Sequence, residues 1–225
     1  VRIYQAAGST NQSVPGAVFF HGGGWMLGSI AADDLFCRKL ASDLNHVVVS
    51  VEYRLAPENV FPAAIDDCYS ACLWTSENAK SLGIDPSQIY VTGNSAGGHL
   101  AAAVALKLAD SGKASTIAAQ VLRIPLTCHP SVWPGEKPPP KKNMPILEDS
   151  TAIAMINAFI TQEKDRGNYL VSPLLASAEL LRQLPPTYID VCSADPLAAG
   201  GIAYAKKLED HGVPVKLFVL DGMPH

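Results

Sequence analysis

The chain has 225 residues, of which 48% are apolar and 17% are charged, and its formal net charge is −4. It contains no basic block and no apolar run approaching about 18 residues, which argues against nucleic-acid binding, anionic-membrane binding and a membrane span as main functions. The composition also argues against a disordered chain, and the length is sufficient for one sizeable hydrophobic core.

Short β-branched and aromatic runs alternate with helical stretches along the chain. The runs that predict strands are residues 17–20, 47–51, 89–91, 121–124, 187–191 and 215–220. They are almost continuously apolar, which is typical of parallel strands covered on both faces. We therefore expect an α/β protein with a mostly parallel, doubly wound sheet and helices on both faces.

Amphipathic helices are expected between these strands. Asp33 or Asp34 is expected to cap the first helix, in which Leu35, Phe36, Leu40 and Leu44 share one face. Further helices are expected to begin at Pro62, Ser95 and Gly200 and to end before Gly83, Gly112 and Gly212.

One stretch interrupts the alternation of strands and helices. Residues 128–169 are rich in proline and contain a helical run near residues 150–161. Long insertions in compact domains are either surface excursions or parts of a functional site. We expect a single domain over residues 1–225, with residues 128–169 as a surface excursion or as a lid or pocket wall.

The five cysteines form no CxxC pair and no pattern with zinc-ligand spacing. Their apolar surroundings and odd number predict buried, reduced thiols. We therefore expect no metal and no cofactor, and a cytoplasmic location.

Residues 93–97 form a G-x-S-x-G motif between a predicted strand and a predicted helix. This context predicts a nucleophile elbow, in which a sharp turn holds the serine in a strained conformation at the carboxyl end of the strand. Gly93 and Gly97 are small enough for the close crossing of strand and helix. Ser95 is therefore the candidate nucleophile.

A second glycine-rich loop, His21-Gly22-Gly23-Gly24-Trp25, also follows a predicted strand. It matches neither the dinucleotide-binding nor the P-loop pattern. Three consecutive glycines let backbone N–H groups approach a ligand closely. Together with the elbow, this loop predicts an oxyanion hole for ester or amide cleavage.

A serine nucleophile needs a base, and the base needs an orienting carboxylate. Asp195 and His225 follow the last two predicted strands and therefore lie at the same sheet edge as Ser95. Asp190 and Asp221 are competing carboxylates, but Asp190 lies within a strand and Asp221 is too close to His225 along the chain. The order Ser95, Asp195, His225 is that of an α/β-hydrolase.

The sequence resembles the hormone-sensitive-lipase family of α/β-hydrolases, which includes bacterial and fungal carboxylesterases. The motifs that carry the resemblance run in family order, and they are His21-Gly22-Gly23-Gly24, Tyr53-Arg54-Leu55-Ala56-Pro57-Glu58, Phe61-Pro62-Ala63-Ala64, the elbow, Ser172-Pro173-Leu174, Asp195-Pro196-Leu197 and Gly222-Met223-Pro224-His225.

The resemblance implies a role for each matching position. It implies Ser95 as nucleophile, Asp195 as triad acid and His225 as base. It implies that Gly23, Gly24 and Ala96 donate backbone N–H groups to the oxyanion, that His21 is structural, and that Trp25 lines the acyl pocket. The remaining expectations rest on the residues themselves: Arg54 and Glu58 as ion-pair partners, and His99 packed or hydrogen-bonded locally.

Three features depart from the family pattern. Asn94 stands beside the nucleophile, at the edge of the expected substrate pocket, where the family commonly has Asp. An N-terminal cap segment and a helix after the catalytic histidine are absent from these 225 residues.

The sequence therefore predicts a cofactor-independent serine carboxylesterase whose partner is a small-molecule ester, with short acyl chains favoured by the resemblance. A homodimer is left open. The alternatives are an amide or lactone hydrolase with the same triad, and a non-catalytic small-molecule receptor of the gibberellin-receptor type. That receptor type has lost the triad histidine, whereas this sequence has His225 at the position.

Overall fold

The computed structural model describes residues 1–6, 13–139 and 144–225. Residues 140–143 of the predicted 128–169 insertion lie outside this described part. The described residues form one seven-stranded sheet with the order β1-β3-β2-β4-β5-β6-β7. The strands are β1 (Arg2–Tyr4), β2 (Val14–Phe20), β3 (Val47–Val51), β4 (Ile84–Asn94), β5 (Ala119–Arg123), β6 (Thr187–Ala194) and β7 (Val215–Pro224).

All neighbouring strands from β3 to β7 pair in parallel, as expected. Strand β1 is an addition that the sequence did not predict, and it pairs antiparallel with β3 through Arg2 and Ser50 and through Tyr4 and Val48. A three-residue strand is too short for the alternation of apolar and polar residues to distinguish it from a loop.

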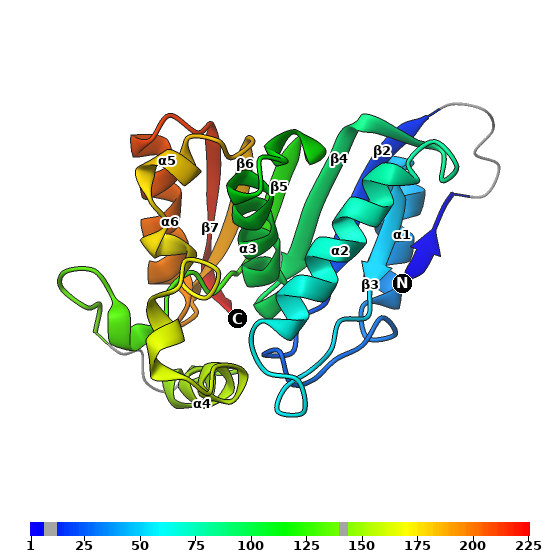
Figure 1. Ribbon diagram of the computed structural model, residues 1–225. Helices are drawn as coiled ribbons and strands as arrows, with labels where there is room; N and C mark the ends of the chain where they lie inside the picture. The colour runs from blue at the N-terminus through cyan, green and yellow to red at the C-terminus, as the bar shows by residue number, and fades with distance from the viewer. Residues whose placement is uncertain (7–12, 140–143) are drawn as a thin grey trace.

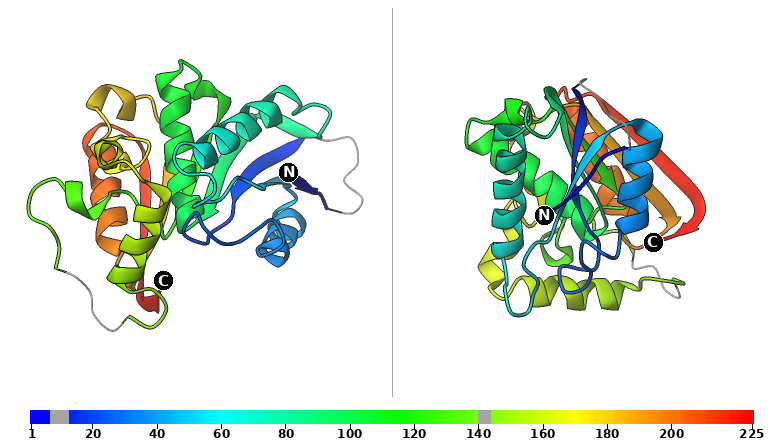
Figure 2. Two further views of the ribbon diagram at one scale, coloured as in Figure 1. Left: turned by 60° about the horizontal axis from the view of Figure 1, so that its bottom comes forward. Right: turned by 90° about the vertical axis from the view of Figure 1, so that its right-hand side faces the viewer.

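Helices cover both faces of the sheet (Figures 1 and 2). They are α1 (Asp34–Leu44), α2 (Ala63–Glu77), α3 (Ala96–Asp110), α4 (Asp149–Phe159), α5 (Ala178–Leu181) and α6 (Ala198–Asp210). Side chains of α2, α3 and α6 pack in the large core on one face, whereas α1 packs in a smaller core on the other. Helix α4 lies below the carboxyl edge of the sheet (Figure 1).

The buried face of α1 differs from the prediction. Leu35 and Leu44 are 73% and 56% exposed, whereas Cys37 and Ala41 are buried against the sheet. The prediction of one face with Leu35, Phe36, Leu40 and Leu44 was therefore wrong for Leu35 and Leu44, whereas Phe36 and Leu40 do pack against this core. The small side chains of Cys37 and Ala41 let α1 approach the sheet closely.

Asp34 does not cap α1, and neither does Asp33, since no side-chain capping bond forms at this end. The Asp34 carboxylate instead accepts hydrogen bonds from Tyr4 Oη at 2.9 Å and from Arg38 Nε at 2.6 Å. The bond from Arg38 and then that from Tyr4 lower the pKa of Asp34. This contact ties β1 to α1.

The Tyr53–Glu58 motif also differs from the prediction in its ion pair. Arg54 forms a two-pronged contact with Asp67, at 2.9 Å from Nε and 2.8 Å from Nη2, and the expected pairing with Glu58 was wrong. Burial raises the pKa of Asp67, but hydrogen bonds from the Arg54 side chain and N–H outweigh it and lower the pKa. Asp67 lies on α2, so the contact joins the loop after β3 to that helix.

Candidate active site

Ser95 lies in the sharp turn between β4 and α3. Its φ is 55° and its ψ is −115°, a conformation that non-glycine residues rarely adopt. A Cβ on Gly93 would lie 2.5 Å from the Phe20 carbonyl oxygen, and a Cβ on Gly97 would overlap the same oxygen. The turn therefore requires glycine at both positions. Because α3 begins directly after Ser95, its positive N-terminal end faces any negative charge that develops there.

The structure brings Ser95 and His225 together across 130 residues of sequence. The Nε2 atom of His225 is 2.7 Å from Ser95 Oγ, and its Nδ1 atom is 2.7 Å from Asp195 Oδ2. In the neutral tautomer that suits both contacts, Ser95 donates to Nε2 and Nδ1–H donates to the carboxylate. The three side chains form a continuous hydrogen-bonded chain, which is the geometry that proton transfer from the serine requires.

Asp195 is fully buried, and its second oxygen accepts a hydrogen bond from the Leu197 N–H at 2.8 Å. The competing carboxylates lie elsewhere. Asp190 is 3.7 Å from Arg123 Nε, and burial raises its pKa. Asp221 accepts a hydrogen bond from Ser193 Oγ at 2.9 Å. Of the three carboxylates, it is Asp195 that contacts His225.

The glycine loop after β2 borders the cavity that contains Ser95. Gly23 and Gly24 have φ values of 116° and 61°, which favour glycine. Their N–H groups and that of Ala96 donate none of the backbone hydrogen bonds found outside helices and strands in the described chain. As the first residue of α3, Ala96 has no intrahelical acceptor either. All three residues line one cavity with Ser95 and His225.

That cavity, here called the catalytic cleft, has a volume of about 510 Å³. Trp25 and Asn94, the two predicted pocket residues, both line it. One wall comes from the 128–169 insertion, which contributes Ile146, Leu147, Thr151, Ala152 and Met155. The Asn94 side chain accepts a hydrogen bond from Arg123 Nη1 at 3.2 Å. Asn94 thereby links the cleft to the Arg123–Asp190 pair.

His99 lies beside the site and is fully buried, which agrees with the expectation that it packs. Its side-chain hydrogen-bond partners are distant in sequence. The Trp25 indole N–H donates to His99 Nδ1 at 3.1 Å, and His99 Nε2 lies 3.2 Å from the Val171 carbonyl oxygen. Burial lowers the pKa of His99 to about 4, so the ring is neutral at pH 7 and Nδ1 is free to accept.

Trp25 is held on its other side by the insertion. Its ring stacks on Phe159 of α4 with 5.0 Å between centroids and 8° between planes. Phe159 also accepts a backbone hydrogen bond from Phe61 at 2.8 Å. These contacts fix α4 over the cleft, and no sequence pattern indicated them because they join segments more than 90 residues apart.

His21 is the first residue of the glycine loop. It is fully buried and stacks on Tyr53 with 4.1 Å between ring centroids. Tyr53 Oη donates to the His21 carbonyl oxygen at 2.7 Å. The contacts fasten the loop to the segment that follows β3.

Residues 1–6, 13–139 and 144–225 contain no group of three or more His, Cys, Asp or Glu side chains arranged to hold a metal ion. Within the same ranges, no helix is both long and apolar enough to cross a membrane. All five cysteines are buried and unpaired, as expected.

Comparisons with known proteins find similar sequences over almost the whole chain. A family model described as alpha/beta hydrolase fold matches residues 17–225. Esterase LipI of Mycobacterium tuberculosis is 38% identical, across 100% of this chain and 69% of the relative. Ethyl acetate hydrolase of Pseudomonas putida is 35% identical, across 100% of this chain and 70% of the relative.

A solved structure shows the same arrangement of elements. An esterase from Pyrobaculum calidifontis superimposes with a TM-score of 0.87 at 35% identity. The match covers 95% of this chain and 69% of that one.

Proposed function

The chain belongs to the hormone-sensitive-lipase family of α/β-hydrolases and is a carboxylesterase, and from this premise we propose how its residues cleave an ester. Ser95 Oγ attacks the acyl carbon while its proton passes to His225 Nε2. Asp195 holds the imidazole in the required tautomer and stabilises the imidazolium that forms. The observation that carries this proposal is the unbroken chain of two 2.7 Å contacts from Ser95 to Asp195.

The oxyanion of the tetrahedral intermediate is bound by the N–H groups of Gly23, Gly24 and Ala96. Each such donor lowers the barrier by roughly 2.7–4 kcal/mol. Collapse of the intermediate releases the alcohol, which takes the proton from His225 Nε2. Water then attacks the acyl-enzyme with His225 as base again, and the carboxylic acid leaves as Ser95 regains its proton.

Short-acyl esters are the substrates that the proposal favours. Trp25 lines the catalytic cleft, and its ring is held between His99 and Phe159. The 128–169 insertion supplies a wall over the same cleft. The name of the relative from Pseudomonas putida, ethyl acetate hydrolase, supports a short acyl group as well.

The test is labelling with a fluorophosphonate followed by peptide mapping, together with the variant Ser95→Ala. We expect the label on Ser95 and a fall in kcat of about 10⁶-fold for Ser95→Ala on p-nitrophenyl acetate. The control is Ser42→Ala, which changes an exposed serine on α1 and leaves both results unchanged. Turnover that survives in Ser95→Ala, or label on another residue, contradicts the mechanism.

A further inference from the structure

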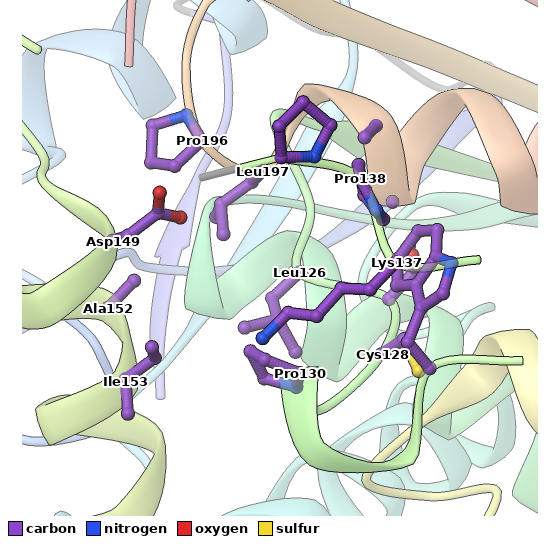
Figure 3. Close-up of a pocket in the computed structure, with 15 residues that line it drawn as sticks. Leu126, Cys128, Pro130, Lys137, Pro138, Asp149, Ala152, Ile153, Pro196 and Leu197 are labelled. Atoms are coloured by element: carbon purple, nitrogen blue, oxygen red, sulfur yellow. The ribbon is translucent and has the colours of Figure 1, made fainter. Parts of the chain in front are cut away.

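A second cavity, here called the side cavity, adjoins the catalytic cleft and has a volume of about 280 Å³. Leu126, Ala152 and Leu197 line both, so the two spaces meet at these three side chains. Figure 3 shows the side cavity between α4, which carries Ala152 and Ile153, and the loop that carries Lys137 and Pro138. Neither the triad nor the oxyanion donors use this space.

The walls of the side cavity are mostly apolar. Four prolines and Trp133 line it together with Leu, Ile and Ala side chains. Among its described lining residues the charged ones are Lys137 and Asp149, which lie on opposite sides and have opposite signs (Figure 3). With one side chain of each sign, the lining carries no net charge, and its apolar walls favour a neutral group over an ionic one.

The size of the side cavity sets the size of its occupant. An apolar cavity of about 150 Å³ accepts benzene in a protein core. The side cavity is larger, at about 280 Å³, and three of its lining residues also line the catalytic cleft. It therefore has room for a six-membered ring that remains attached to the reacting ester.

The topology shows which half of the ester reaches the side cavity. The oxyanion donors Gly23 and Gly24 follow β2, on one side of β4. The side cavity is built from segments that follow β5 and β6, on the other side of β4. His225 follows β7 on this same side, and the leaving alcohol must face His225 to receive its proton.

We propose that the side cavity is the subsite for the alcohol group of the ester and takes a neutral, ring-sized apolar group such as benzyl. The proposal rests on the proposed function, since it assumes that Ser95 and His225 cleave the ester. It adds a preference for esters of cyclic or aryl-methyl alcohols that the triad alone does not specify.

The experiment fills the side cavity and compares two acetates that differ only in the alcohol. Ile153→Phe and Ala199→Leu add volume from two different walls, and neither residue lines the catalytic cleft. We expect kcat/KM for benzyl acetate, measured by acid release, to fall at least tenfold relative to ethyl acetate, as for other misfitted apolar pockets. The matched control is Ala154→Phe, at an exposed neighbour on α4, and it leaves the ratio unchanged.

Further measurements distinguish a failure of this subsite proposal from a failure of the proposed function. The proposal is overturned if wild-type protein does not hydrolyse benzyl acetate. It is also overturned if kcat/KM falls equally for benzyl acetate and ethyl acetate in folded variants. A selective fall in kcat/KM for ethyl phenylacetate, which has its ring on the acyl side, would overturn it as well. Circular dichroism identifies a misfolded variant, and the other filling variant then decides. Ester hydrolysis that persists in Ser95→Ala refutes the proposed function instead, whatever the benzyl-to-ethyl ratio.

Discussion

At the scale of single residues, His99 shows how burial controls a side chain next to the site. The ring accepts a hydrogen bond from Trp25 and contacts the Val171 carbonyl, so it serves only as the neutral form. A proton on Nδ1 would place two donors against each other. The environment that lowers the pKa of His99 to about 4 therefore also keeps Trp25 in place at pH 7.

This lowered pKa predicts a specific pH dependence of stability. Between pH 6.5 and about 4 the unfolded chain binds a proton at His99 and the folded chain does not, so the free energy of unfolding falls as the pH falls. A pKa shift of this size corresponds to about 3 kcal/mol in the free energy of unfolding. Lowering the pH below about 4 causes no further loss of stability through His99.

The variant His99→Leu tests this prediction. At pH 7 it is expected to be less stable by about 1–3 kcal/mol, because the Trp25 indole N–H and the Val171 carbonyl lose their partner. Urea unfolding at pH 7 and pH 4.5 should show the gap to wild type narrowing as the pH falls. The control is His46→Leu, at a partly exposed histidine, which should retain most of the wild-type slope. Parallel pH profiles for wild type and His99→Leu would contradict the assignment.

Ion pairs at this scale are difficult to predict from spacing. Arg54 and Glu58 are four residues apart, but the segment between them is not helical, so this spacing does not bring the side chains together. Asp67 is 13 residues away and becomes the partner because α2 packs beside the loop. Local sequence does not contain that information.

At the scale of elements, the elbow is the feature that sequence predicted best. Strand, turn and helix are contiguous, and the glycines are required by contacts that every such turn makes. The strained φ of Ser95 and the close approach at Gly93 and Gly97 agree with that expectation. Helix α1 was harder, because several of its faces carry apolar residues and only the packing partner selects one of them.

The crossing of β4 and α3 gives a prediction for Gly97→Ala. The added Cβ overlaps the Phe20 carbonyl oxygen, so strand and helix must separate, which costs about 1–3 kcal/mol or more. A displacement of this kind moves Ser95, and we expect kcat/KM to fall by about 100-fold. The matched control is Gly167→Ala, where nothing lies within 4 Å of the added Cβ and stability and activity should remain at wild-type values. Wild-type activity in folded Gly97→Ala would show that the close crossing is not required.

At the scale of the whole molecule, the sheet is unevenly protected. Strand β3 is buried along its whole length, whereas β7 lies at the edge and exposes Phe218, Val219 and Leu220 by 46%, 51% and 43%. Exposed edge strands open locally at lower free energy than buried central strands. His225 directly follows β7, so the proposed base is attached to one of the least protected strands of the described sheet.

We therefore expect the 225-residue chain to lose activity before it unfolds as a whole. In a urea titration, hydrolysis of p-nitrophenyl acetate should fall at a lower concentration than tryptophan fluorescence and circular dichroism change. Amide hydrogen exchange should also be faster in residues 215–224 than in residues 47–51. Coincident activity and spectroscopic transitions would mean that β7 unfolds only together with the core.

The sequence by itself determined the strand runs, the parallel sheet and the chain order of Ser95, Asp195 and His225. It did so because parallel strands need continuous apolar runs and because their carboxyl ends meet at one edge. Tertiary structure decided which carboxylate reaches His225, which groups hold Trp25, and where the side cavity lies. These outcomes depend on contacts between segments tens of residues apart, and such contacts form only when the whole sheet and its covering helices pack together.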